Sequence, residues 1–246
     1  ADMLPLDKWA VTRLNDLLTK AYTAYDNYEF HVVSHMINDF CVVDLSSFYF
    51  DIIKDRLYCG EASGLERRSA QTAVWLILDA MTRMFAPILA FTCDEIWLAM
   101  PHRAADDARN VLFNEMVQPY AAYALSQEEM GRWARIAALR TAVNGALEQA
   151  RADKTIGKSL EAEVDVTVPA EDAFLAELNA DTLADLLIVS QVRVTVGDAL
   201  SVTVAPAQGV KCARCWKVLT SVGTVAGHDT LCPRCAAVVK ALPVVE

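Results

Sequence analysis

Four cysteines near the end of the chain have the spacing of a metal site. They follow the pattern Cys212-x2-Cys215-x16-Cys232-x2-Cys235. Two residues between paired cysteines let one tight turn present both sulfurs to the same ion, and two such turns complete a tetrahedron of thiolates. Zinc prefers this ligand set, and a shell closed by four protein ligands is typical of a structural site. The spacing therefore predicts one structural zinc ion.

The expected redox setting favours a zinc site over disulfides or free thiols. Two disulfides or four free thiols are the alternative, but the N-terminus lacks a basic segment leading into an apolar one, so a reducing, cytoplasmic location is expected. His228 lies between the pairs, where four sulfurs already complete the shell. Cys41, Cys59 and Cys93 stand alone in apolar, helical surroundings, and we expect them to be small buried hydrophobic residues.

Charge is distributed unevenly along the 246 residues. Residues 207–246 hold five lysines and arginines against two acids, whereas the preceding residues hold 17 against 30, so a short basic segment follows an acidic body. Such a segment suits a specific contact with nucleic acid better than a general one. The composition is that of a globular protein, and no run reaches about 18 apolar residues, so no membrane-spanning helix is expected. The chain begins with Ala1-Asp2 rather than Met, which indicates processing or a longer parent.

The cysteine segment, residues 207–246, is called the zinc module below, and we expect it to display side chains. Forty residues bury little core, so the metal should supply most of the folding free energy. Basic side chains beside the metal turns could neutralise phosphates, and an exposed tryptophan could stack on an unpaired base. In the alternative interpretation the ring packs against its turn and the charges are only solvated. The candidates for RNA contact are Arg214, Trp216, Lys217 and Arg234.

Helical periodicity dominates residues 1–123. Apolar residues recur at steps of three and four from Leu6 to Tyr28, and a second segment continues the pattern from Phe30 to Phe48. Residues 65–85 are apolar on most sides, which places that helix centrally in a bundle, and Pro87 should end it. Three capping boxes predict helix starts. They are Ser63-x-x-Glu66, Thr92-x-x-Glu95 and Ser126-x-x-Glu129.

The period changes after a helix that is predicted from residue 126 to about residue 153. Valines alternate with polar residues at 164–168, which predicts a strand. Short helices at about 171–178 and 181–187 and two more alternating runs, 188–196 and 200–204, complete an α+β unit. The expected fold is mainly α. Its three domains are a helical bundle at 1–123, a small α+β domain at 124–206 and a four-cysteine zinc ribbon or knuckle at 207–246.

Three weaker patterns are assigned no chemistry. Ile156-Gly-Lys-Ser159 is similar to the end of a phosphate-binding loop, but position 152 is Ala and a helix rather than a strand precedes it. His31 and His35 are four residues apart without a third ligand, and Asp94-Glu95 suits a helix start. The one residue retained from these patterns is Lys158, which could touch an RNA backbone.

Several stretches, in order, resemble class I aminoacyl-tRNA synthetases for branched aliphatic amino acids. Three of them are similar to the anticodon-binding helical domain of that family: Lys54-Asp-Arg-Leu-Tyr58, Glu66-Arg-Arg-Ser-Ala-Gln71 and Ala86-Pro-Ile-Leu-Ala-Phe-Thr-Cys-Asp-Glu-Ile-Trp97. Ile156-Gly-Lys-Ser-Leu-Glu-Ala162, followed by a strand, resembles the C-terminal extension of bacterial isoleucyl-tRNA synthetases, and so does the four-cysteine segment. The resemblance covers nearly the whole chain.

The resemblance implies a function. The parent enzymes join isoleucine to its tRNA with ATP, and this part would hold the anticodon stem-loop of the isoleucine-accepting tRNA. The sequence contains neither the His-x-Gly-His-type nor the Lys-Met-Ser-Lys-Ser-type motif of ATP and adenylate chemistry. We therefore expect ATP to bind only in a catalytic domain outside this sequence, and we expect this chain alone to be inactive. A monomer that contacts tRNA and no membrane is expected.

Two groups of basic residues could grip the RNA backbone on this interpretation. Lys54, Arg56, Arg67 and Arg68 surround one junction between helices. A second run lies along the helix that leads toward the zinc module: Arg132, Arg135, Arg140, Arg151, Lys154 and Lys158. An ordinary solvated charge is the alternative for each.

Two rival functions remain open. The four-cysteine spacing resembles the zinc finger of formamidopyrimidine-type DNA glycosylases, which use an N-terminal proline as nucleophile. This chain begins Ala-Asp-Met-Leu-Pro, and its first 120 residues are expected to be helical. The second rival is a non-enzymatic module whose zinc ribbon binds protein, and it predicts no affinity for tRNA.

Overall fold

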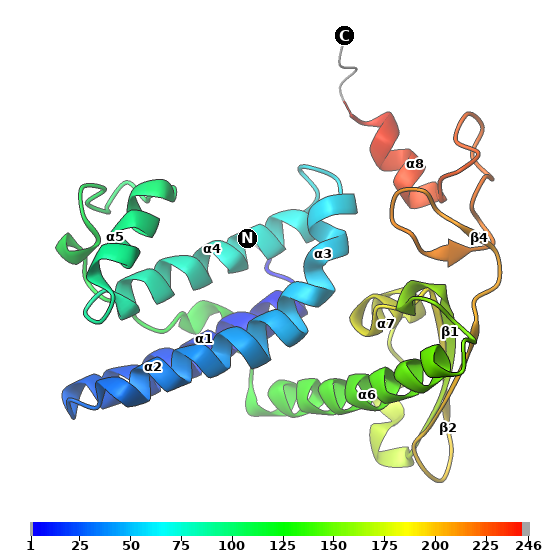
Figure 1. Cartoon of the computed structure of the whole chain (residues 1–246), viewed down its shortest axis with the longest axis horizontal. Coiled ribbons are helices and arrows are strands. Elements are labelled where there is room, and N and C mark those ends of the chain that lie inside the picture. Colours follow the sequence, from blue (N-terminus) through cyan, green and yellow to red (C-terminus); the bar gives the residue numbers. More distant parts are fainter. Residues whose placement is uncertain (1, 243–246) are drawn as a thin grey trace. The chain divides into compact units, whose positions relative to one another are not determined.

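The computed structural model describes residues 2–242, which form two compact units. The helical unit contains the residues up to Leu57 and those from Ala62 to Ser126. The mixed unit contains the residues from Gln127 onward and, in addition, the short segment Tyr58–Glu61. The predicted fold class, mainly α with a small sheet and a four-cysteine module, is confirmed (Figure 1).

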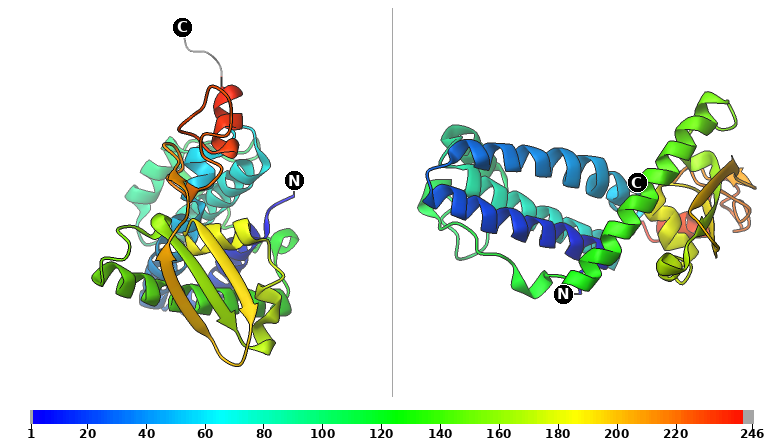
Figure 2. Two further views of the ribbon diagram at one scale, coloured as in Figure 1. Left: turned by 90° about the vertical axis from the view of Figure 1, so that its right-hand side faces the viewer. Right: turned by 90° about the horizontal axis from the view of Figure 1, so that it is seen from below.

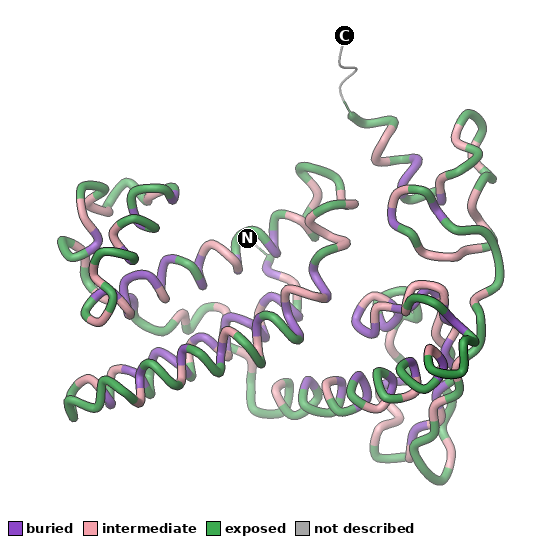
Figure 3. Tube along the Cα trace, viewed as in Figure 1, coloured by how far each residue is buried: buried purple, intermediate pink, exposed green. Residues whose placement is uncertain are grey.

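Long helices lying side by side make the helical unit (Figure 2, right). Helix α1 packs against both α2 and α4, and α5 packs against α4. The apolar stripe of α1 is buried at Leu6, Leu14 and Leu17. Figure 3 shows buried segments recurring along the long helices of this unit. The elements are α1 (Pro5–Asp26), α2 (Phe30–Asp39), the π-helix η1 (Phe40–Tyr49), α3 (Phe50–Cys59), α4 (Leu65–Phe85), α5 (Ala90–Ala99) and the 3-10 turns η2 (Val111–Phe113) and η3 (Ala121–Tyr123).

A ten-residue π-helix, η1, continues α2 into α3 and accounts for an irregular core spacing. Phe40 and Leu45 are both buried although they are five residues apart. Five is the hydrogen-bond step of a π-helix, whereas an α-helix brings residues three and four apart onto one face. The wider coil therefore keeps the second apolar segment facing the core.

The predicted first helix ends earlier than expected. Helix α1 stops at Asp26, and Tyr28 adopts a left-handed conformation with φ of 62°. The turn places Tyr28 and Phe30 at the surface, 81% and 47% exposed, so the prediction that they belong to the apolar faces was wrong. Periodicity missed the turn because these aromatic residues happen to continue the spacing of the stripe.

Capping boxes predicted helix starts unevenly. Helix α6 begins directly after Ser126, as expected. The helix predicted at residues 65–85 is confirmed as α4, with Gly64 rather than Ser63 at the N-cap, whereas α5 begins at Ala90, ahead of Thr92. Helix α4 ends at Phe85, before Pro87, as predicted. The Thr92 box therefore lies in the first turn of α5 rather than at its start.

Asp7 is fully buried where α1, η1 and α4 meet. Its carboxylate accepts hydrogen bonds from the Tyr49 hydroxyl at 2.7 Å and the Ser69 hydroxyl at 2.5 Å, and Arg56 lies 3.5 Å away. Burial raises the pKa of Asp7 because it disfavours the charged form, and these three partners only partly offset that effect.

The raised pKa of Asp7 predicts a pH dependence of stability. Over the range from its ordinary pKa up to its raised value the folded protein holds the proton more tightly than the unfolded chain. The free energy of unfolding should therefore fall as pH rises through this range. Urea unfolding at several pH values should show that the parent loses stability relative to Asp7→Asn as pH rises above about 4. A relative gain would mean that the ion pair, not burial, governs this carboxyl.

A second buried carboxylate, Asp79, anchors the loop that follows α5. Its two oxygens accept hydrogen bonds from Arg83 Nε and Arg103 Nη2, each at 2.8 Å. Arg83 also binds Asp106 at 2.7 Å and lies 4.7 Å from the centroid of the Trp97 ring. The network ties α4 to residues 101–116 through ions removed from water, which makes it a sensitive point for stability.

The mixed unit is built on a three-stranded sheet with the strand order β2-β1-β3 (Figure 2, left). Strand β1 is parallel to β2 and antiparallel to β3, and its buried residues Val164, Val166 and Val168 alternate with more exposed ones. Helix α6 packs on β3 and α7 on β2. The elements are α6 (Gln127–Ala152), η4 (Ser159–Glu161), β1 (Ala162–Val168), η5 (Ala170–Leu175), α7 (Ala180–Leu187), β2 (Gln191–Val196) and β3 (Ser201–Pro206).

Two local expectations in this unit were wrong. The helix expected at about 171–178 is a 3-10 helix ending at Leu175. Ile188, expected in a strand, caps α7 in a left-handed conformation with φ of 56°, and β2 starts only at Gln191. Both are short segments, in which a pattern of two or three residues cannot separate a turn from a regular element.

The zinc module has little regular structure. Strands β4 (Val210–Lys211) and β5 (Val218–Leu219) form an antiparallel pair, and α8 (Pro233–Lys240) follows the loop. Gly209 precedes β4 with φ of 122°, and a Cβ there would lie 2.3 Å from the backbone carbon of Leu219. Only glycine meets both requirements, so Gly209 allows the pair to close.

Candidate zinc site and RNA-binding surface

The four predicted cysteines meet in one buried cluster. Their sulfurs all lie within 4.8 Å of one another, and those of Cys215 and Cys232 are 3.9 Å apart. Four sulfurs about 2.3 Å from a central zinc ion would be separated by about 3.8 Å, so the cluster fits a tetrahedral zinc shell. When bound, the ion would supply cross-linking rather than catalysis, because four thiolates leave no open position.

Two short elements aim the sulfurs inward. The first pair lies on the turn after β4, where the Cys212 N–H donates to the Lys217 carbonyl oxygen at 2.9 Å. In the second pair, Cys232 caps α8 and Pro233 occupies its first position. Proline suits that position because its missing N–H would have no partner there. The helix N-terminus also favours the negative charge of a thiolate.

Hydrogen bonds prepare one thiol for metal binding. Burial raises the pKa of Cys212, but backbone N–H groups of Cys215, Cys232 and Arg214 more than offset this and bring the pKa to about 6. Burial raises the pKa of Cys215 to about 11. Metal binding requires the thiolate form, so the N–H donors around Cys212 favour the state that zinc needs.

Arg214, a predicted RNA contact, has partners within the mixed unit. Its Nη1 donates to the Cys59 carbonyl oxygen at 2.6 Å and lies 3.9 Å from the sulfur of Cys235, and its Nη2 lies 3.4 Å from the Tyr58 carbonyl oxygen. The guanidinium therefore joins a metal-site sulfur to the segment Tyr58–Glu61. Groups that hydrogen-bond to metal ligands in this way orient them.

Trp216 is held outward beside the metal site. Its backbone is left-handed, with φ of 66°, and its N–H donates to the Cys212 carbonyl oxygen at 3.0 Å. The side chain is 58% exposed, so the alternative in which the ring packs into the turn is not what the structure contains. The ammonium of Lys158 lies 6.0 Å from the ring centroid, which brings two predicted contacts together.

The other two candidates of the zinc module differ in accessibility. Lys217 is largely buried, 12% exposed, and its ammonium lies 2.5 Å from Asp185 of α7. Arg234 is exposed in the first turn of α8. Arg234 is therefore placed to meet a phosphate, whereas Lys217 holds the module against α7.

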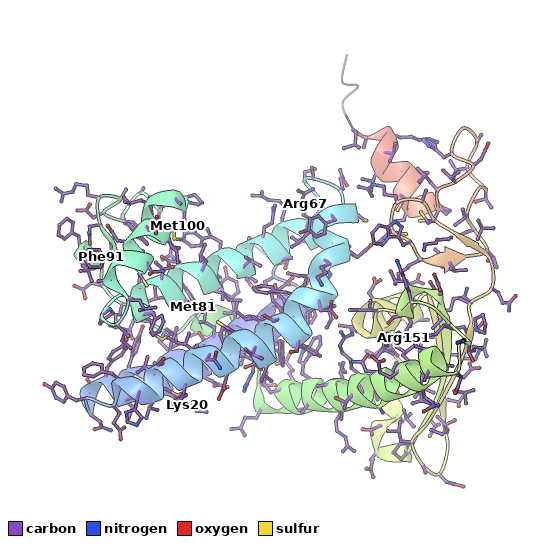
Figure 4. All side chains as sticks on the ribbon, in the orientation of Figure 1. Lys20, Arg67, Met81, Phe91, Met100 and Arg151 are labelled. Atoms are coloured by element: carbon purple, nitrogen blue, oxygen red, sulfur yellow. The ribbon has the colours of Figure 1, made fainter. Side chains whose placement is uncertain are left out.

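The four candidates of the helical unit are likewise divided. Arg56 is 17% exposed and paired with Asp7, whereas Lys54 is exposed with Asp51 at 2.9 Å. Arg68 is exposed and lies 3.4 Å from the Gln71 side chain. Arg67, near the start of α4 (Figure 4), has a buried Nε with no hydrogen-bond partner among the described residues.

Most of the basic run along α6 is neutralised locally. Arg135 pairs with Glu171 and Asp172, and Arg151, labelled in Figure 4, pairs with Glu148. Arg140 is buried and donates to the Leu186 carbonyl oxygen at 2.7 Å. Arg132 also has an acidic neighbour, Glu128. Lys154 and Lys158 are both exposed, and among the described residues neither ammonium group is within salt-bridge distance of a carboxylate, although Glu161 accepts the backbone N–H of Lys158 at 3.1 Å.

Sequence reasoning missed the contribution of Tyr58–Glu61. Cys59 was expected to be buried, but it is half-buried and packs against the four-cysteine cluster, and Cys41 is half-buried too. Only Cys93 of the three lone cysteines is fully buried. No local signal predicts a contact between residues 155 positions apart, as Cys59 and Arg214 are.

Two family models match this chain. Residues 7–166 match the anticodon-binding domain of tRNA ligase, and residues 209–238 match a zinc finger found in FPG and IleRS. The first match covers well over half of the sequence, so the chain belongs to the family of tRNA-ligase anticodon-binding domains. The zinc-finger match and the cysteine cluster together show a site for one structural zinc ion. The zinc-finger family includes both FPG and IleRS proteins, and the match to the anticodon-binding domain favours the IleRS type.

Bacterial isoleucine–tRNA ligases are similar to nearly the whole chain. The sequence is 44% identical to the enzyme of Syntrophotalea carbinolica over 96% of this chain, and 42% identical to that of Geobacter sulfurreducens over 97%. The alignments cover 26% of each relative, so the chain spans about a quarter of the length of the curated relatives it matches. Among the described residues, no helix is long and apolar enough to cross a membrane.

Proposed function

We propose that this chain is the C-terminal, tRNA-binding part of an isoleucine–tRNA ligase, and that it holds the anticodon stem-loop of the isoleucine-accepting tRNA. The observation that carries the proposal is the order of the two matches, an anticodon-binding domain followed by a zinc finger of the isoleucyl type. The names of the similar relatives support the isoleucine specificity. Ligation with ATP would then belong to domains outside residues 1–246, and this chain alone should not activate isoleucine.

Further parts of the proposal concern the site. Cys212, Cys215, Cys232 and Cys235 are the zinc ligands, and the three domains divide near residues 123 and 206. The exposed cations Lys54, Arg68, Arg234 and Lys158 contact RNA phosphates, and Trp216 stacks on a base. Arg67 contacts RNA as well, with its Nε donating a hydrogen bond to an RNA oxygen. The working protein is a cytoplasmic monomer bound to tRNA.

Salt-sensitive tRNA binding is the expected result that tests this function. The purified chain should bind isoleucine tRNA with an affinity that falls steeply between low and high salt, because phosphate contacts release counterions. Replacing Lys158 with alanine should lower the slope of log affinity against log salt by about 1. Fluorescence anisotropy at four or more salt concentrations measures both quantities.

The matched control for Lys158 is Arg193→Ala. Arg193 is an exposed cation of the same unit, but Glu163 and Asp165 neutralise it at 2.9 Å and 2.7 Å. Its loss should leave the salt slope unchanged. Absence of tRNA binding by the zinc-loaded chain would favour the rival function, a zinc module that binds protein.

A further inference from the structure

Two strongly exposed aromatic rings belong to the neighbourhood of the zinc site. Tyr58 is 77% exposed and Trp216 is 58% exposed. Exposed rings occur elsewhere in the chain too, but these two belong to segments joined at one ordered metal site, which favours a binding surface there. Both residues lie within the mixed unit.

One guanidinium connects the backbone segments that carry the two rings. Arg214 donates to the carbonyl oxygens of Tyr58 and Cys59, and it lies two residues before Trp216. In return, the Cys59 thiol lies 3.6 Å from the Arg214 carbonyl oxygen. Because Cys59 also packs against the cysteine cluster, the metal site, Arg214 and the Tyr58 backbone form one connected structure.

The backbone of Trp216 is held in an unfavourable conformation. A left-handed φ is an outlier for a bulky residue, and such strain persists only where surrounding structure enforces it. Here two features enforce the left-handed conformation of Trp216: the preceding residue, Cys215, is buried, and the Trp216 N–H donates to the Cys212 carbonyl oxygen. The result is an indole directed to solvent with the Lys158 ammonium 6.0 Å from its centroid.

From these contacts we infer that Tyr58 and Trp216 are a pair of stacking rings for two unpaired bases of an RNA loop, and that Arg214 is the residue that positions them. The inference rests on the proposed function. It adds Tyr58 as a second base contact and gives Arg214 a positioning role in place of the predicted RNA contact. Aromatic faces stack on any base, and the basic balance of the zinc module suits the phosphates between those bases. Arg214 then acts through backbone carbonyl groups rather than through a phosphate.

The test of Tyr58 measures the affinity of the full chain for an anticodon stem-loop RNA. Tyr58→Ala and Trp216→Ala should each weaken binding by about 5- to 150-fold, the range of one lost base stack. Tyr58→Phe keeps the ring and should bind within about twofold of the parent. A 2-aminopurine base placed in the loop should lose its quenching on binding when the ring that stacks on it is removed. Phe91→Ala, which removes a 93% exposed ring from α5 (Figure 4), is the matched control and should change nothing.

The test of Arg214 compares two substitutions at equal zinc content. A phosphate contact would be rescued by Arg214→Lys and would lower the salt slope in Arg214→Ala by about 1. If Arg214 positions the rings instead, lysine should not rescue binding, because an ammonium cannot reproduce the fork of guanidinium donors. Both variants should then bind RNA more weakly and keep the parental slope of log affinity against log salt. If the parent binds RNA but Tyr58→Ala binds equally well, the stacking pair is overturned and the proposed function stands. If the parent does not bind RNA at all, both are overturned.

Discussion

Removing the zinc ion should unfold residues 209–240 and leave the helical unit folded. The core cluster of this module consists of the four buried cysteines, and the residues that pack against it, Leu219, Val222 and Leu231, are only partly buried. So small an apolar core cannot offset the entropy of ordering the module. Structural zinc sites supply about 10–16 kcal/mol of apparent binding free energy at neutral pH, which is available only to the folded module.

Hydrogen exchange with and without a chelator measures this effect residue by residue. The N–H groups of Cys212 and Trp216, which are bonded within the first turn, should lose protection on chelation, whereas those of α1 and α4 should keep it. Cys235→Ser should reproduce the loss, and Cys41→Ser, at a half-buried thiol in the helical unit, is the control. Protection that survives complete zinc removal would contradict a metal-dependent fold.

Replacing Asp79 with alanine should lower the free energy of unfolding of the helical unit by about 3–5 kcal/mol, the cost of breaking a buried ion pair from one side. The substitution would leave Arg83, only 8% exposed, without one of its carboxylate partners, and would also release Arg103. Residues 101–116, which these arginines hold against α4, should lose order together.

Chemical unfolding followed by the helical signal measures the loss. The control is Asp16→Ala, because Asp16 lies on α1 of the same unit, 53% exposed and 3.7 Å from Arg13. Exposed pairs of this kind contribute about 0–1 kcal/mol, so the two substitutions should differ clearly. Equal effects would mean that the Asp79 network is no stronger than a surface ion pair.

The metal site and the long helices could be predicted from the sequence because their signals are local. The Cys212–Cys215 and Cys232–Cys235 spacings each fit within one turn, and the apolar stripe of α6 repeats over 26 residues. The π-helix was not predicted, although its step of five between Phe40 and Leu45 was visible in the sequence. A single irregular step cannot be distinguished from chance without the neighbouring helices.

The partners of the basic residues could not be predicted. Arg214, Lys217 and Arg56 have the same sequence signature as an RNA contact, yet each has a partner at least 32 residues away. Those pairings depend on how the elements fold together, which spacing does not encode. Exposure therefore reduces the candidate set to residues such as Lys158, Trp216 and Arg234.

The most direct test of the central claim is the affinity of the zinc-loaded chain for two anticodon stem-loops that differ only in their anticodon bases. The proposed function predicts that the isoleucine stem-loop binds more tightly than the altered one, by about 1–3 kcal/mol for each base that is read, and that chelation weakens the binding of both RNAs. Equal affinity for the two RNAs, with or without zinc, would contradict it.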